Sequence, residues 1–154
     1  MMQEPNALPV SNLQKRAMAF VIDDIIVSLF FFTIFYDQLL AVLNTVEHQQ
    51  DPQIVLQIMN TFVMEKVSIL FALKILYHGV LVWQNGMTIG KYLMRIRVID
   101  LSSAQTPTLK TAFLRALIRI PGEFFFYAGF IMAFFMPLKQ ALHDKISNCV
   151  VIDA

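Results

Sequence analysis

The sequence predicts an all-α integral membrane protein with three hydrophobic segments and a short cytoplasmic β-hairpin-like element. Its 154 residues are 57% hydrophobic and 15% charged, and the apolar residues gather into runs long enough to cross a bilayer. The formal net charge of +1 gives no reason to expect a nucleic-acid partner, and the single cysteine cannot form an internal disulfide. We therefore expect the lipid bilayer to surround this chain.

The apolar runs define the expected organisation. Residues 1–14 are polar and are predicted to form a flexible cytoplasmic tail, followed by a membrane domain over residues 15–152. The first run extends from Ala17 to Tyr36 and the second from Phe62 to Trp83, with a loop and a helical return predicted between them. The third run, residues 111–136, is interrupted by Pro121-Gly122 and is predicted to be a bent or re-entrant helix pair.

Basic residues predict the orientation. They precede the first run and cluster between the second and third, whereas Asp37 to Asn60 contains neither lysine nor arginine. The positive-inside rule then places the N-terminus in the cytoplasm. We expect the membrane to be a bacterial inner (cytoplasmic) membrane. A single crossing by the third run would leave the C-terminus outside. We favour a return to the cytoplasm, because Cys149 to Ile152 is the natural strand partner of Ile96 to Ile99.

Charged residues within the apolar runs are the candidate functional residues. Asp23 and Asp24 lie inside the first run, where a charged side chain is energetically unfavourable unless a partner forms an ion pair or hydrogen bond with it. Helix rise places the second-run residues Lys74 and His78 at comparable depth. Arg115, Arg119 and Glu123 recur at intervals of four and predict one charged stripe on the third run. The candidate ion-pair or ion-pathway residues are therefore Arg16, Asp23, Asp24, Lys74, His78, Arg115, Arg119, Glu123 and Asp144.

Two interpretations of these charges remain open. One is a structural ion-pair network that fixes the register of the helices, with Asp144 pairing Arg115 or capping a short helix. The other is an ion or proton pathway, in which the aspartates offer oxygen ligands and a buried Lys74 loses its proton when a cation arrives. Arg16 lies about 10 Å from Asp23 along a helix axis and is expected to snorkel to the headgroups. Asp23 is the acid whose loss we expect to matter most.

Several segments, in order, resemble the RDD family of small membrane proteins, named for an arginine and two aspartates. They are Arg16-x-x-Ala19-x-x-Ile22-Asp23, Gly86-Met87-Thr88-Ile89-Gly90-Lys91 followed by Ile96-Arg97-Val98, Arg115, and Leu142-His143-Asp144-Lys145 with Val150-Val151. The resemblance covers nearly everything from Lys15 to Ile152. It implies a link to sodium/proton exchange in some members. We expect Gly86, Thr88, Gly90 and Lys91 to form a structural turn that feeds an interfacial helix, because the spacing does not fit a phosphate-binding loop.

The predicted function is cation or proton transport, with Na⁺ or H⁺ as the ion, by this chain alone or within an assembly. The alternative is a non-catalytic accessory or scaffold subunit of a larger membrane-protein complex. In either case we expect a homo-oligomer or another membrane protein as partner, since so few helices can hardly enclose a pathway. Without a nucleophile beside a base, no enzyme activity is expected, and no cofactor or metal is predicted.

Overall fold

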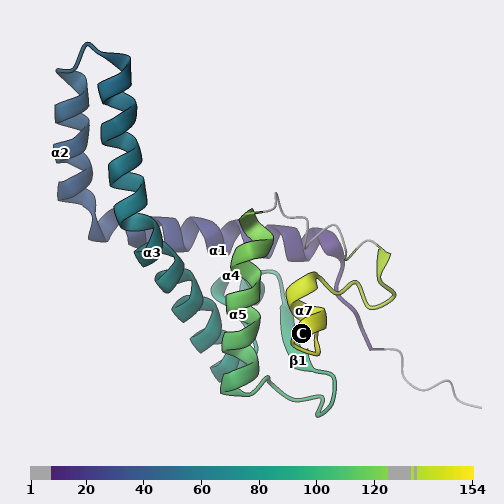
Figure 1. Ribbon diagram of the computed structural model, residues 1–154. Coiled ribbons are helices and arrows are strands. Elements are labelled where there is room, and N and C mark those ends of the chain that lie inside the picture. The colour runs from purple at the N-terminus through teal and green to yellow at the C-terminus, as the bar shows by residue number, and fades with distance from the viewer. Residues whose placement is uncertain (1–7, 125–132, 134) are drawn as a thin grey trace, which may run out of the picture. The chain divides into compact units, whose positions relative to one another are not determined.

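The computed structural model describes residues 8–124, 133 and 135–154. These residues are mostly helical, with one small antiparallel sheet (Figure 1). The chain divides into two compact units, of which the first joins Met1–Asp24 with Ile75–Ala154 and the second is Ile25–Lys74. Two long helices, α1 (Leu13–Ile34) and α3 (Pro52–Asn85), each contribute residues to both units.

The second unit contains a helix where the sequence predicted mainly loop. Helix α2 (Tyr36–Glu47) runs beside the start of α3, to which a short connection joins it (Figure 1). The start of α3 is fixed by Asp51, whose carboxylate accepts a hydrogen bond from the Gln53 amide at 2.8 Å, and by Pro52, whose missing N–H costs nothing in a first helical turn. The expected loop is therefore wrong where α2 lies, whereas the expected helical return is confirmed as the first part of α3, which continues through the second apolar run as one 34-residue helix.

Two of the three expected hydrophobic segments are confirmed as helices long and apolar enough to cross a membrane, α1 and α3. Only 17% of each apolar window is buried within the chain. The third is represented by α5 (Leu109–Phe124), which has 16 residues and buries Arg115 and Arg119 while exposing Leu114 and Leu117. Helix α5 continues through Pro121, and the returning half of the predicted helix pair falls on residues 125–132 and 134, outside the described residues.

The predicted strand pair is confirmed in the first unit. Strands β1 (Ile96–Asp100) and β2 (Cys149–Asp153) are antiparallel, with Val98 opposite Val151. They do not form a hairpin, because the segment between them contains α5 and α7 (Leu142–Ile146). Since hydrogen-bonded strands lie on the same side of any membrane, the chain between β1 and β2 must return to its starting side.

The sheet has a buried core on each face. One core joins residues of both strands to the helices and consists of Ala19, Val82, Ile96, Val98, Ala112, Cys149 and Val151. The other contains Ile99, Val150 and Ile152 and is covered by Val10, Leu101 and Leu138. Strand residues at alternate positions thus face opposite cores.

The end of the predicted N-terminal tail is packed rather than free. Val10 forms a β-bridge with Ile152, and the Ser11 hydroxyl donates a hydrogen bond to the Val151 carbonyl at 3.1 Å. Ser11 is fully buried. Residues 10 and 11 therefore extend the small sheet, and the flexible-tail prediction does not hold for this part of the segment.

The predicted turn after α3 is also confirmed. Gly86 has φ of +69°, a conformation that costs glycine little, and its carbonyl accepts a hydrogen bond from the Val98 amide at 2.7 Å. The short helix α4 (Ile89–Leu93) follows, with Thr88 as its N-cap. This turn brings α4 and β1 back against the first unit's other elements.

Candidate functional site

Asp23, from the buried face of α1, is the centre of a cluster that ties α1 to α3 and α4. Its Oδ1 atom accepts hydrogen bonds from the Tyr77 hydroxyl and the Gly90 amide, both at 2.8 Å, and its Oδ2 atom accepts one from the Thr88 hydroxyl at 2.6 Å. Lys91 places its Nζ atom 3.7 Å from Oδ2. We call these five residues the Asp23 cluster. Asp23 is fully buried, so these donors replace the water that its carboxylate would bind elsewhere.

Close packing of α4 onto α1 makes this arrangement possible. A Cβ atom on Gly90 would overlap the Ala19 carbonyl and would lie 2.8 Å from Asp23 Oδ1. Glycine therefore lets the α4 backbone approach closely enough for its amide to reach the carboxylate. Burial lowers the pKa of Lys91 to about 7, although the nearby Asp23 charge opposes this effect.

Asp144 is the centre of a second cluster, which ties α1 and α5 to α7. Arg115 donates to its Oδ1 atom from Nε at 2.8 Å and from Nη2 at 2.6 Å, while Arg16 and the Ala141 amide, the latter at 3.2 Å, donate to Oδ2. The ring of His143 lies 3.5 Å from Oδ1. We call these five residues the Asp144 cluster. Asp144 thus both pairs with Arg115 and caps the start of α7, two roles that the sequence predicted as alternatives.

The two arginines control the ionisation of this cluster. Burial alone would raise the pKa of Asp144, but the charges of Arg115 and Arg16 outweigh it and hold that pKa well below its usual range. Burial, together with the neighbouring arginines, lowers the pKa of the His143 ring to about 3 despite the opposing effect of Asp144. Asp144 is therefore ionised and His143 neutral at physiological pH.

Arg16 corrects a sequence prediction. It is 4% exposed, donates to Asp144 and also to the Lys139 carbonyl, and does not snorkel to headgroups. A helix-rise argument along α1 could not find this partner, because Asp144 follows 128 residues later in the chain. The separation of Arg16 from Asp23 was predicted correctly, since the two residues belong to different clusters.

Other predicted site residues are distributed around these clusters. Arg119 donates a hydrogen bond from Nη1 to His78 Nδ1 at 3.0 Å and lies over the Phe20 ring, with 4.4 Å from its guanidinium carbon to the ring centre. Asp24 is half-buried. Lys74 is the last residue of the second unit and is not in either cluster. The Glu123 side chain lies outside the described part of the structure.

The sequence analysis missed the partners of Asp23. Lys91 and Thr88 were predicted only as turn residues, and Tyr77 was not singled out. The available signal was chemical: a deeply buried carboxylate needs several donors, and the segment from Thr88 to Lys91 offers a hydroxyl, free helix N-terminal amides and an amine. Among the residues that the structure describes, no group of three or more His, Cys, Asp and Glu could hold a metal ion.

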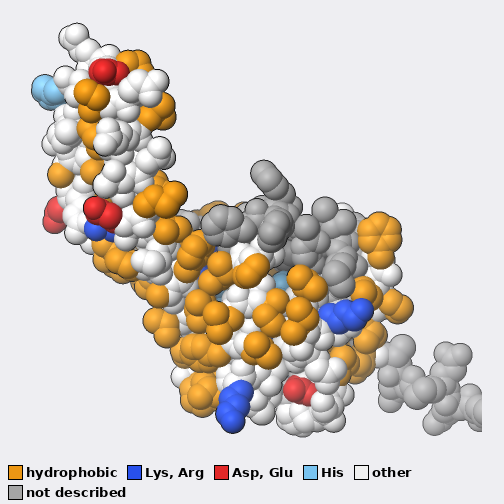
Figure 2. Space-filling model, viewed as in Figure 1, with side chains coloured by type: hydrophobic (Ala, Val, Ile, Leu, Met, Phe, Trp, Pro, Cys, Tyr) orange, Lys and Arg blue, Asp and Glu red, His pale blue; other side chains and the backbone are white. Residues whose placement is uncertain are grey.

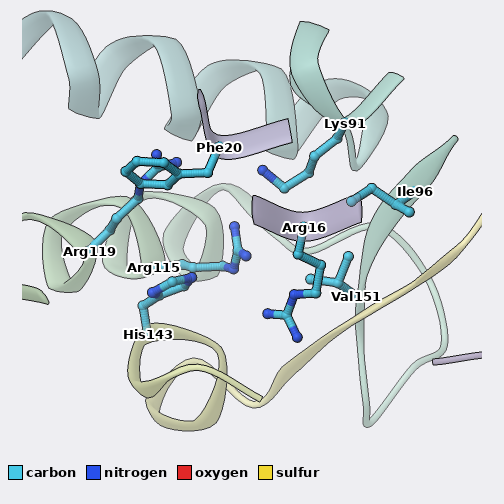
Figure 3. A pocket seen from close by; sticks show the side chains of 8 residues that line it. All are labelled: Arg16, Phe20, Lys91, Ile96, Arg115, Arg119, His143 and Val151. Atoms are coloured by element: carbon cyan, nitrogen blue, oxygen red, sulfur yellow. The ribbon is translucent and has the colours of Figure 1, made fainter. Parts of the chain in front are cut away.

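A small cavity of about 20 Å³ lies in the first unit beside the two clusters. Its polar lining consists of Arg16, Lys91, Arg115, Arg119 and His143, and its apolar lining consists of Phe20, Ile96 and Val151. Figure 3 shows how these side chains come from helices and strands on all sides, with the Lys91 amine pointing inward and the Phe20 ring stacked on Arg119.

Two helices are long and apolar enough to cross a membrane, and buried charged residues gather in the first unit, features that fit the class of small helical membrane proteins. The chain matches the RDD family over residues 10–148 and belongs to that family. It is similar to an uncharacterized protein of Rickettsia prowazekii, with 36% identity over 70 residues. That match covers 46% of this chain and 38% of the relative, so the chain spans well under half the length of the relative. No solved structure matches.

Proposed function

We propose that this chain is a non-catalytic accessory or scaffold subunit of a larger membrane-protein complex in the bacterial inner membrane. The observation that carries the proposal is that protein donors already occupy the hydrogen-bonding positions of the two fully buried carboxylates, Asp23 and Asp144. A carboxylate offers about four lone-pair positions. Asp144 accepts four hydrogen bonds from protein donors. Asp23 accepts three, and the Lys91 amine lies 3.7 Å from its Oδ2 atom.

This occupancy argues against a cation site at either aspartate. Small cations in proteins need several oxygen ligands, and here the oxygens already bind N–H and O–H groups that a cation would have to displace. The surface supports an interaction role. Most of the surface of α1 and α3 is left for lipid or protein, and hydrophobic side chains also gather over α5 on the face shown in Figure 2. Leu114 and Leu117 of α5 are about half exposed.

Reconstitution tests the absence of transport. The purified full chain in liposomes with an internal pH-sensitive dye should show no more Na⁺-driven proton flux than empty liposomes. In mild detergent, native electrophoresis of solubilised membranes should place the chain in a complex larger than its 17.7 kDa mass. Flux that Asp23→Asn abolishes and Asp153→Asn preserves, in equally stable proteins, would overturn the accessory-subunit proposal.

A second candidate, proton transport, is favoured by Lys91. Its amine is buried 3.7 Å from Asp23 and burial brings its pKa to about 7, so it can exchange a proton near neutral pH. In this case the wild-type liposomes should carry a proton flux that changes steeply around pH 7. Lys91→Met should remove the flux, whereas Lys110→Met, at an exposed position of α5, should not.

The orientation belongs to the same proposal, with the N-terminus and the sheet in the cytoplasm. The fully buried Cys149 is a poor reporter, so single cysteines are better placed at the exposed positions Ser103, in the turn after β1, and Gln50, between α2 and α3. In intact cells an impermeant thiol reagent should label Gln50→Cys and should label Ser103→Cys only after permeabilisation. The reverse pattern would invert the proposed orientation.

A further inference from the structure

Helix α3 is too long for the bilayer that it is expected to cross. At about 1.5 Å per residue its 34 residues measure about 51 Å, whereas the hydrocarbon core of a bilayer is about 30 Å thick. Tilts of up to about 40° do not absorb this difference. The 22 residues of α1 measure only about 33 Å, which is enough for one crossing. A crossing by α3 therefore leaves part of this helix outside the bilayer.

A contact within the second unit indicates where the outer part of α3 begins. The Lys66 amine lies 5.5 Å from the centre of the Phe35 ring, and Phe35 directly follows α1. The end of α1 is therefore level with Lys66. The remainder of α3, from Lys66 to Asn85, has about 20 residues and measures about 30 Å, which suffices for the crossing. Helix α2 and residues 52–65, which lie side by side in Figure 1, then form a helical hairpin outside the bilayer. We call it the projecting hairpin.

The two helices of the projecting hairpin leave a groove between them. Its volume of about 350 Å³ falls within the range of about 300 to 1,000 Å³ that is typical of ligand pockets. Its apolar wall consists of Val42, Ile54, Ile58 and Phe62. Its polar side consists of Gln57, Thr61 and Glu65. These three residues follow one another at intervals of four and form one stripe along α3. An apolar wall beside a polar stripe fits an amphipathic helix.

The charge of the projecting hairpin selects the kind of helix. Residues 36–65 contain four acidic residues and neither lysine nor arginine. The four are Asp37, Glu47, Asp51 and Glu65, and all are exposed. The amine of Lys66, the next residue, lies 3.6 Å from a Glu65 oxygen, but the Glu65 side chain is still 61% exposed. Four negative charges repel anionic lipid headgroups and a second copy of the same hairpin, and they attract a cationic partner.

We infer that this groove binds a basic amphipathic helix of a partner protein on the outer side of the membrane. The inference rests on the proposed role as an accessory subunit and names the surface through which the chain binds its partner. Apolar side chains of the partner helix pack against Val42 and Ile58, and a lysine or arginine beside them reaches Glu65.

Two substitutions on opposite sides of α3 test the groove in native membranes. Thr61 and Val63 are exposed residues of similar size, and they lie nearly opposite each other because each residue turns a helix by about 100°. Of the two, Thr61 lines the groove. In native electrophoresis of solubilised membranes, Thr61→Trp should release the chain from its complex and Val63→Trp should not. Both variants should keep the wild-type Tm, because neither position is buried.

The outcomes of this test separate the inference from the accessory-subunit proposal. A complex that survives both substitutions would overturn the groove assignment and leave the accessory-subunit proposal standing. A complex of two copies that Thr61→Trp dissociates would assign the groove to a second copy and would overturn the inferred partner. If the wild-type chain forms no complex, the accessory-subunit proposal fails, and the inference is judged by peptide binding.

A pair of synthetic peptides tests the chemistry of the partner. One helical peptide carries leucine at every third or fourth position with lysine between, and the other has glutamate in place of lysine. With the full chain in nanodiscs of zwitterionic lipid, fluorescence anisotropy should show binding of the lysine peptide above that to empty discs and no binding of the glutamate peptide. Glu65→Gln should weaken the binding about three- to fivefold, as expected for one exposed ion pair, whereas Glu47→Gln, outside the groove, should change it less than about twofold. Equal binding of the two peptides, no binding of the lysine peptide, or equal effects of the two substitutions would overturn the inference.

Discussion

The Asp144 and Asp23 clusters each surround a fully buried aspartate, but the two aspartates lie in different electrostatic environments. Asp144 is bound by two arginines, whereas the hydrogen bonds of Asp23 come from a tyrosine, a threonine and a backbone amide, with a lysine at 3.7 Å. An arginine cannot deprotonate in a protein, but a buried lysine can. Removing the Asp144 carboxylate therefore leaves two arginines charged and without their counter-ion. Removing the Asp23 carboxylate leaves one lysine, which can become neutral by losing its proton.

This contrast makes Asp144→Asn the most damaging substitution. It leaves Arg16 and Arg115 buried without their counter-charge, and breaking a buried pair in this way costs about 3 to 5 kcal/mol. Asp153→Asn is the control, since its pair with Lys15 is more than 40% exposed at both side chains and is worth at most about 1 kcal/mol. Denaturant unfolding in detergent measures both. Equal losses would show that burial does not separate the two pairs.

Asp23→Asn should cost less, about 1.5 to 3 kcal/mol, which is the usual value of hydrogen bonds to a charged group. Asparagine keeps one acceptor oxygen, and Lys91 can become neutral. This expectation reverses the sequence-based ranking, in which Asp23 was the critical acid, and makes Lys91 the partner to test. The double variant Asp23→Asn with Lys91→Met should recover part of the loss in the same unfolding measurement. Strict additivity of the two single losses would rule out coupling.

Gly90→Ala tests the packing that assembles the Asp23 cluster. The added methyl group meets the Ala19 carbonyl and the Asp23 carboxylate, so α4 must move away from α1, at a cost of about 1 to 3 kcal/mol. Gly122→Ala provides the control in α5, because among the described residues no atom outside its own stretch of helix lies within 4 Å of the added Cβ, and alanine is the better helix former by about 1 kcal/mol. Thermal unfolding should move in opposite directions for the two variants. A harmless Gly90→Ala would exclude close α1–α4 packing.

Acid sensitivity between pH 6.5 and 5.5 should be concentrated in the Asp144 cluster and should be the smallest of these effects. His143 has a folded pKa of about 3 against an ordinary value of 6.5, so the unfolded chain binds the proton first and stability falls as the pH drops from about 6.5 toward 3. Between pH 6.5 and 5.5 the loss is at most about 1.4 kcal/mol. His143→Gln should flatten this part of the pH–stability curve. His48→Gln, at an exposed position of α2's C-terminal end, should leave it unchanged.

Local sequence patterns determined much of this protein. Apolar run length predicted α1 and α3, glycine and threonine at the right spacing predicted the turn into α4, and alternation predicted that Ile96 to Ile99 pairs with Cys149 to Ile152. These features depend on neighbouring residues, and helix and strand periodicity describes such features well. The same reasoning failed over Tyr36–Glu47, where a loop was expected and α2 forms.

Only the tertiary structure decided which charges meet. Arg16 was assigned to the headgroups but binds Asp144. Asp23 was expected to need a partner, and it lies beside Lys91 with Tyr77, Thr88 and Gly90. The sequence gives the depth of a side chain along its helix, which is one of three coordinates. A hydrogen bond depends on all three, because it is directional and fails beyond about 3.5 Å. The packing of α4 and α7 onto α1 sets the other coordinates, and residues far apart in the chain determine that packing.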